Sequence, residues 1–183
     1  MSFSYSFETT TMLNGNALYR SGNRYLISGT FAYAWNDHWT TQLGASLSHY
    51  DKNRVLVGVI GLSPLATEAF NSNSNSYPVN LALTYAGENF SIGPTLSFLY
   101  RDKNAWSPTS FQFAPAKRSW GAGLKGQYAI RENVTLSASA ERVWLTESSN
   151  PNKILAGVVI PGTGTPGYDT LSWRMSFGMT YGF

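Results

Sequence analysis

Apolar and polar residues alternate one by one through most of this chain. In residues 170–183 every second residue from Leu171 to Phe183 is apolar, and the residues between them are small or polar apart from Arg174. Successive side chains of a β-strand point to opposite faces of its sheet, so this spacing predicts a strand with one apolar and one polar face. A helix would need apolar residues every three or four positions instead.

The same alternation recurs in seven further segments, each bounded by turn-forming residues. Together the eight segments cover residues 2–8, 25–35, 39–48, 77–85, 90–101, 120–130, 134–141 and 170–183. Short connections at 36–38, 87–89 and 131–133 alternate with long ones near 14–23, 51–76, 102–116 and 148–168. This rhythm is typical of an up-and-down meander with short turns at one end and long loops at the other.

The composition favours a membrane around this sheet. Charged residues make up 13% of the chain, against about 25% in an ordinary soluble domain. No run of about 18 apolar residues occurs, which excludes a spanning helix. Aromatic residues gather near both ends of the predicted strands, as at the two interfaces of a bilayer. We therefore expect one all-β domain over 1–183, an eight-stranded antiparallel up-and-down transmembrane β-barrel.

Two other barrels fit parts of the pattern. A soluble lipocalin-like barrel would turn the apolar face inward, but Leu, Trp, Phe and Tyr on every strand are too bulky for the interior of eight strands. The other possibility is that the chain is the C-terminal part of a wider barrel. The alternation that begins at once in residues 2–8 and the even number of segments argue mildly against this second alternative.

The segment 170–183 also resembles a known group of proteins. Its alternate apolar residues and terminal aromatic are similar to the last strand of small bacterial outer-membrane β-barrels, typified by outer membrane protein A. The resemblance implies a location in the bacterial outer membrane, a signal peptide removed before Met1, and recognition by the outer-membrane assembly machinery. The residues that would carry this assembly signal are Trp173, Phe177, Tyr181 and Phe183. A looser similarity exists to the channel family of the phenol meta-cleavage pathway.

Four charged residues occupy mid-strand positions on the predicted inward face: Glu8, Lys125, Glu141 and Arg174. They belong to the first, sixth, seventh and eighth segments, which are consecutive around a closed barrel. Unpaired charges in a narrow lumen would be costly, so the two acids and two bases should pair. The cluster predicts either a structural plug or a gate.

Two long loops are unusually apolar. They contribute eight aliphatic residues to a predicted loop mouth: Val55, Leu56, Val57, Ile60, Ile154, Leu155, Val159 and Ile160. These segments either pack on each other or form an apolar mouth that captures a small hydrophobic ligand or a partner.

Little in the sequence indicates catalysis. There is no cysteine, and the two histidines, His38 and His49, fall at opposite ends of the predicted strands. His49 and Asp51 share a face, but local spacing places no serine beside them, unlike the His-x-Ser of outer-membrane lipid A deacylases. We expect no catalytic residue, cofactor or metal site. The modest, unclustered net charge of +3 argues against nucleic acid as a partner.

For function, we expect a narrow channel or passive transporter for small molecules, hydrophobic ones among them, with the lipid bilayer as its surroundings. The alternative is a structural or interaction protein with a plugged lumen, whose extracellular loops bind a partner or a surface.

Overall fold

The computed structural model describes residues 2–6, 10–13, 16–20, 22–51, 54–55, 74–110 and 113–182. In this part of the chain the fold is all β and mostly antiparallel, without a helix. One sheet has eight strands in the order β1-β4-β5-β7-β8-β9-β10-β13. Their bounds are Ser2–Ser6 (β1), Arg24–Ala34 (β4), Trp39–Tyr50 (β5), Ser74–Ala86 (β7), Phe90–Arg101 (β8), Lys117–Arg131 (β9), Val134–Glu147 (β10) and Tyr168–Tyr181 (β13). The eight-stranded antiparallel sheet is thereby confirmed.

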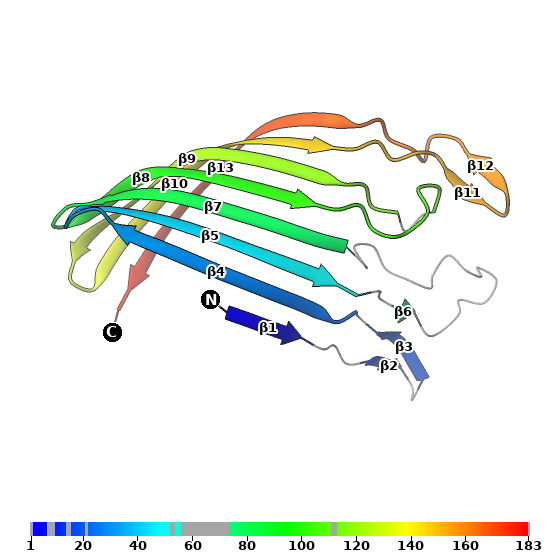
Figure 1. Cartoon of the computed structure of the whole chain (residues 1–183), viewed down its shortest axis with the longest axis horizontal. Helices are drawn as coiled ribbons and strands as arrows, with labels where there is room; N and C mark the ends of the chain where they lie inside the picture. The colour runs from blue at the N-terminus through cyan, green and yellow to red at the C-terminus, as the bar shows by residue number, and fades with distance from the viewer. Residues whose placement is uncertain are drawn as a thin grey trace.

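Short turns lie at one end of the sheet and long connections at the other (Figure 1). In the turn between β4 and β5, Asn36 Oδ1 accepts hydrogen bonds of 2.9 Å from the backbone N–H groups of both His38 and Trp39. An asparagine side chain that bonds backbone two and three residues ahead closes a tight turn.

Small additional strands occur in the long connections. β2 (Thr10–Leu13), β3 (Asn16–Arg20) and β6 (Arg54–Val55) form a three-stranded sheet. β11 (Lys153–Leu155) and β12 (Val158–Ile160) form a hairpin. Its two turn residues, Ala156 and Gly157, have φ angles of 50° and 82°, as a two-residue turn that follows the twist of a hairpin requires.

The strand registers separate the two faces of the sheet. One row of cross-strand partners is entirely apolar: Phe31, Leu43, Leu81, Leu96 and Ala122. The adjacent row is polar or small: Thr30, Gly44, Asn80, Ser97 and Gly121. On the polar face, the side chains of Ser97 on β8 and Glu141 on β10 are hydrogen-bonded across β9. The sheet therefore curves toward this face, which is the concave one.

In the described part of the chain, no buried core covers the apolar face. Phe113 and Val143 are the buried hydrophobic residues among those described. On the apolar face, Phe31 is 62% exposed and Phe177 is 84% exposed. Soluble monomers rarely leave so large a continuous apolar surface uncovered.

The sheet is open, with β1 and β13 as its edges. Five residues of β1 pair with β4, whereas fourteen residues of β13 pair with β10. Between β1 and β13 the described residues show no pairing.

Two prolines interrupt the ladders inside the sheet. The pairing of β5 with β7 is interrupted at Tyr77 and Pro78, and that of β7 with β8 is interrupted at Gly93 and Pro94. Proline has no N–H to donate to a neighbouring strand. The strands therefore keep their register on either side of each gap but lose hydrogen bonds within it.

Candidate functional site

The polar face carries one well-connected carboxylate, Glu141 on β10. Its side chain is 16% exposed, and its Oε2 accepts a 3.1 Å hydrogen bond from Nη1 of Arg174 on β13. Its Oε1 accepts a 2.5 Å hydrogen bond from the hydroxyl of Ser97 on β8. We call Ser97, Glu141 and Arg174 the Glu141 cluster. It joins three strands on the concave face.

Glycine at position 121 makes room for this cluster. Gly121 lies on β9, between Ser97 and Glu141, and is paired with Ser97 in the strand register. A Cβ at this position would lie 2.1 Å from Glu141 Oε1 and 2.3 Å from Ser97 Oγ. Any side chain here would displace the carboxylate or the hydroxyl.

The structure brings together two of the four predicted lumen charges, Glu141 and Arg174. Lys125 is exposed on the same face, opposite Gly93 and Ser139 in the register. No ion pair joins Lys125 to another described residue. Glu8 lies outside the described residues. Ser97 was not singled out from the sequence, since its role depends on which strands become neighbours.

A second polar network lies at the long-loop end of the apolar face. His49 Nδ1 is 2.7 Å from Asn75 Oδ1, and His49 Nε2 is 3.4 Å from Asp51 Oδ1. Asn75 Nδ2 in turn donates to Asp102 Oδ2 at 3.1 Å. The hydroxyls of Tyr25 and Tyr77 donate to Asp51 and Asp102, each at 3.3 Å.

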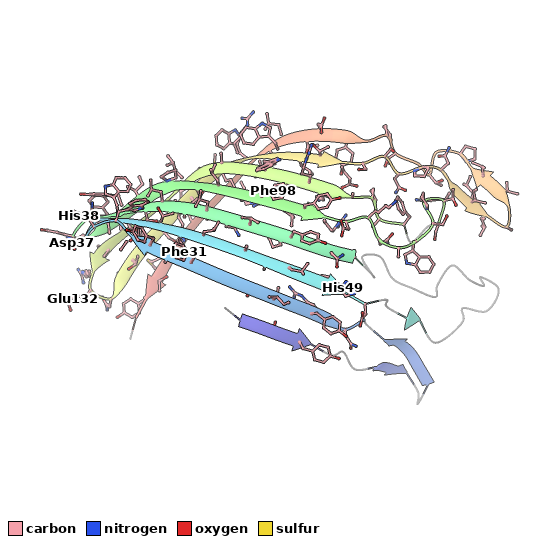
Figure 2. All side chains as sticks on the ribbon, viewed as in Figure 1. Phe31, Asp37, His38, His49, Phe98 and Glu132 are labelled. Carbon is pink, nitrogen blue, oxygen red and sulfur yellow. The ribbon has the colours of Figure 1, made fainter. Side chains whose placement is uncertain are left out.

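This network lacks the arrangement of a nucleophile beside a base. Ser48 is 6% exposed and, by the alternation of β5, lies on the opposite face from His49. Figure 2 shows His49 near the long-loop end and His38 at the short-turn end. The network ties together the long-loop ends of β4, β5 and β7, and its hydroxyls are those of Tyr25 and Tyr77, which donate to Asp51 and Asp102.

The long loops pack around a buried lysine. Lys153 is 4% exposed, and its Nζ donates to the carbonyl of Pro108 at 3.2 Å and to Asn150 Oδ1. The ammonium also lies 5.3 Å from the ring centroid of Phe113. Burial lowers the pKa of Lys153, because desolvation disfavours the charged form. Lys153 thus holds the β11–β12 hairpin against the loop that follows β8.

The predicted loop mouth is described only in part. Ile154, Leu155 and Val159 are exposed on the β11–β12 hairpin, and Ile160 is half-buried. Val55 lies in β6. Leu56, Val57 and Ile60 fall outside the described residues.

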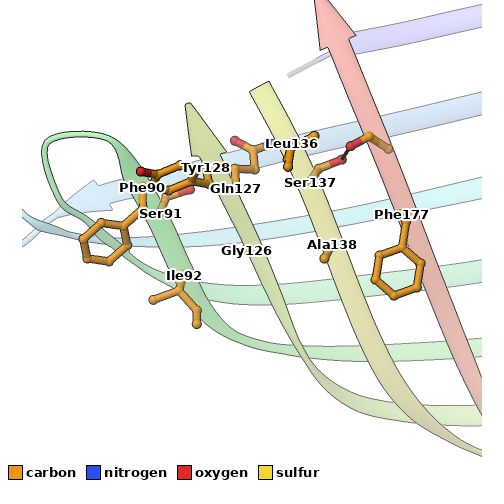
Figure 3. A pocket seen from close by; sticks show the side chains of 11 residues that line it. Phe90, Ser91, Ile92, Gly126, Gln127, Tyr128, Leu136, Ser137, Ala138 and Phe177 are labelled. Atoms are coloured by element: carbon orange, nitrogen blue, oxygen red, sulfur yellow. Dashed lines mark hydrogen bonds between the residues drawn. The ribbon is translucent and has the colours of Figure 1, made fainter. Parts of the chain in front are cut away.

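Two adjoining apolar hollows on the convex face form a groove beside β10, and Figure 3 shows the hollow nearer the short turns. Small residues, Gly126, Ala138 and Ala140, floor it. Larger side chains on β8, β9 and β13 wall it: Phe90, Ile92, Leu124, Tyr128, Met175 and Phe177. We call it the β10 groove.

The predicted assembly residues lie along the exposed edge strand. Trp173, Phe177 and Tyr181 on β13 are 58%, 84% and 53% exposed. Phe183 is outside the described residues. Recognition by an assembly machinery stays a prediction.

No family model, curated protein or solved structure matches this chain. In the described part of the chain no helix is long and apolar enough to cross a membrane. The same residues contain no group of three or more acidic or histidine side chains that could hold a metal ion.

Proposed function

We propose that this chain forms a β-barrel of the bacterial outer membrane, with a narrow, polar passage for small molecules. The supporting observation is the uncovered apolar face opposite a polar concave face. Lipid would cover the apolar side chains, and the polar residues would line the lumen. The first test is to refold the chain into detergent. A β-rich far-UV spectrum and heat-modifiable gel migration are expected, and a soluble monomer that needs no detergent would contradict the proposal.

The proposed barrel closes by pairing β1 with β13. Eight strands about 4.8 Å apart, tilted by about 35–45°, need a stagger of roughly 8 to 12 residues at the seam. One row of cross-strand partners runs through the whole sheet: Ser4, Leu26, Ser48, Ser76, Arg101, Lys117, Glu147 and Tyr168. In the closed barrel, the partner of Ser4 is displaced along β13 from Tyr168 by this stagger. The stagger must be even to keep the polar face inward, so Ser4 would lie opposite Ser176, Gly178 or Thr180.

Cysteine pairs can test this closure, because the chain has no cysteine of its own. Ser4→Cys is combined in turn with Ser176→Cys, Gly178→Cys and Thr180→Cys. One of the three pairs should form an intrachain disulfide in the refolded protein. Ser4→Cys with Ser172→Cys is the control, since no allowed stagger brings these positions together. A chain in which no pair crosslinks is not a closed eight-stranded barrel.

The passage itself would be narrow. An eight-stranded barrel encloses little more than its own inward side chains. A glycine at an inward position such as Gly44, where a Cβ would meet nothing nearer than Thr30 Oγ1 at 3.9 Å, leaves part of that space free. Small conductance steps in planar bilayers, altered by Arg174→Met, are the expected result. If the folded barrel inserts but gives no conductance, the result would favour the structural or interaction protein instead.

The unequal edges favour a second candidate, a wider barrel of which this sheet is one part. Within the described residues, β13 offers fourteen residues for pairing and β1 offers five. Additional strands or chains would then complete the wall. Larger conductance and intermolecular crosslinks from the same cysteines would identify this case.

A further inference from the structure

By the alternation of their strands two arginines lie on the apolar face, Arg118 on β9 and Arg142 on β10, and Arg142 is the one farther from the long loops. In the strand register Arg142 of β10 is opposite Ala122 on one side and Trp173 on the other. It continues the apolar row that contains Leu96. Its guanidinium carbon lies 5.1 Å from the centroid of the Trp173 ring. Arginine stacks well on tryptophan, but stacking leaves its N–H groups free.

The donors of Arg142 have no hydrogen-bond or ion-pair partner among the described residues. This sets it apart from Arg174, which is paired with Glu141 on the opposite face. A charged group that faces lipid is strongly destabilising at the middle of a bilayer and much less so at its surface. An anionic group of suitable height would remove this cost.

The height of Arg142 suits a lipid headgroup. It lies eight residues beyond Val134, the first residue of β10. Eight residues of a strand tilted by about 40° rise roughly 20 Å, near the top of an apolar band about 25 Å tall. Trp144 and Trp120, paired with each other one step nearer the loops, are 44% and 55% exposed. Tryptophan typically marks the interface.

The β10 groove leads directly to this arginine. Its floor residues Ala138 and Ala140 occupy the two positions before Arg142 on the same face of β10. Met175, which walls the groove, is likewise the next apolar-face residue after Trp173 on β13. An acyl chain in the groove would therefore end at the guanidinium.

We propose that Arg142 and the β10 groove form a binding site for a phosphate-bearing anionic lipid. The phosphate is held by the Arg142 guanidinium, which is oriented by the Trp173 ring. One acyl chain lies along Ala140 and Ala138. This inference rests on the proposed membrane location, and it adds a lipid of defined chemistry to it.

Native mass spectrometry of the refolded protein in a zwitterionic detergent can test the site. The probes are dioctanoyl phosphatidic acid and dioctanoyl phosphatidylcholine, which share their acyl chains. The wild-type protein should retain the phosphatidic acid at least fivefold better. Arg142→Gln should reduce this preference below twofold. Arg131→Gln, which removes an exposed arginine at the turn end, should leave the preference unchanged.

A groove variant separates the tail from the headgroup. Ala140→Leu should weaken the binding of both lipids by a similar factor and keep the headgroup preference. Inorganic phosphate should not displace the lipid, since it has no acyl chain. Equal retention of the two lipids by wild type, no effect of Arg142→Gln, or displacement by phosphate alone would overturn the site.

A folding assay distinguishes a failure of the lipid site from a failure of the proposed membrane barrel. Each protein is first checked for heat-modifiable migration in detergent. A chain that folds without detergent contradicts the membrane barrel. An intact barrel without lipid preference contradicts only the lipid site.

Discussion

Arg174 and Glu141 are directly opposite each other on the last two strands of the sheet, and a 3.1 Å hydrogen bond joins their side chains. This ion pair fixes the register of β13 against β10. A slip by one residue would move Arg174 to the apolar face and bring Trp173 to the polar one. The ion pair therefore stabilises the register of the whole strand and also neutralises the charges of its two members.

Removing the arginine should destabilise the barrel. Arg174→Met leaves the Glu141 carboxylate with Ser97 as its partner. Because the Arg174 side chain is 72% exposed in the open sheet, the pair should contribute about 1 kcal/mol or less there. In a closed, drier lumen the loss would be on the order of 3–5 kcal/mol. Thermal unfolding in detergent measures the difference, and Glu141→Gln in the same chain should restore part of it.

Position 121 should not tolerate a side chain. Gly121→Ala places a methyl group against Glu141 and Ser97, and overpacking of this kind costs about 1–3 kcal/mol. Gly44→Ala is the matched control on the same polar face, where the nearest neighbour of an added Cβ, Thr30 Oγ1, is 3.9 Å away. The two unfolding temperatures are compared. Equal temperatures would show that the Glu141 cluster does not need the glycine.

A charge on the convex face should hinder insertion, whereas one on the concave face should not to the same extent. Phe177→Lys puts an ammonium on the face proposed to contact lipid, at an expected cost of about 2–4 kcal/mol if it lies near mid-membrane. Gln127→Lys adds the same charge on the polar face. The folded fraction in liposomes is read from heat-modifiable migration. Equal yields for both variants would contradict the assignment of the faces.

The loops should become more stable as the pH rises toward 10. Since burial lowers the pKa of Lys153, the unfolded chain binds more protons than the folded one between that lowered pKa and the usual 10.5. The free energy of loop unfolding therefore increases with pH across this window. Limited proteolysis at pH 8 and pH 10 gives the measurement.

Lys153→Met is the variant that isolates this effect. It lacks the titrating group and two hydrogen bonds, each worth about 1 kcal/mol. Its loops should be cut faster at pH 8, and the difference from wild type should widen at pH 10. Tyrosine titration affects both proteins, so only their difference is informative. A constant difference would mean that the Lys153 proton is not linked to loop stability.

The faces of the sheet were predictable from the sequence, because alternation depends on neighbouring residues alone. The pairing of Arg174 with Glu141 also followed, since both were assigned to the inward face of adjacent strands. The hydrogen bond between Glu141 and Ser97 could not be predicted from alternation, because the two residues are not on adjacent strands. These residues are 44 positions apart, and they meet only because Gly121 on the intervening strand has no side chain.

The face of Arg142 was predictable from the sequence, but its role as a site was not. The alternation of residues 134–141 continues to Arg142 and places it with the apolar set, whereas the predicted charge cluster consisted of inward-facing residues. The packing of Lys153 had no sequence signal of its own, because a lysine in a long loop is usually solvated. Its burial results from contacts with Pro108 and Phe113, in a different loop.

The strictly sequential strand order has a consequence for the folding pathway. From β4 to β13, every strand of the large sheet pairs with the strand before it, so each ladder can form soon after its two segments meet. Local contacts of this kind cost little loop-closure entropy and form quickly. Joining β1 to β13 would instead bring together segments at opposite ends of the chain. Closure of the barrel by pairing β1 with β13 should therefore be the last and slowest step of folding. A long-lived intermediate with both edge strands unpaired should precede it.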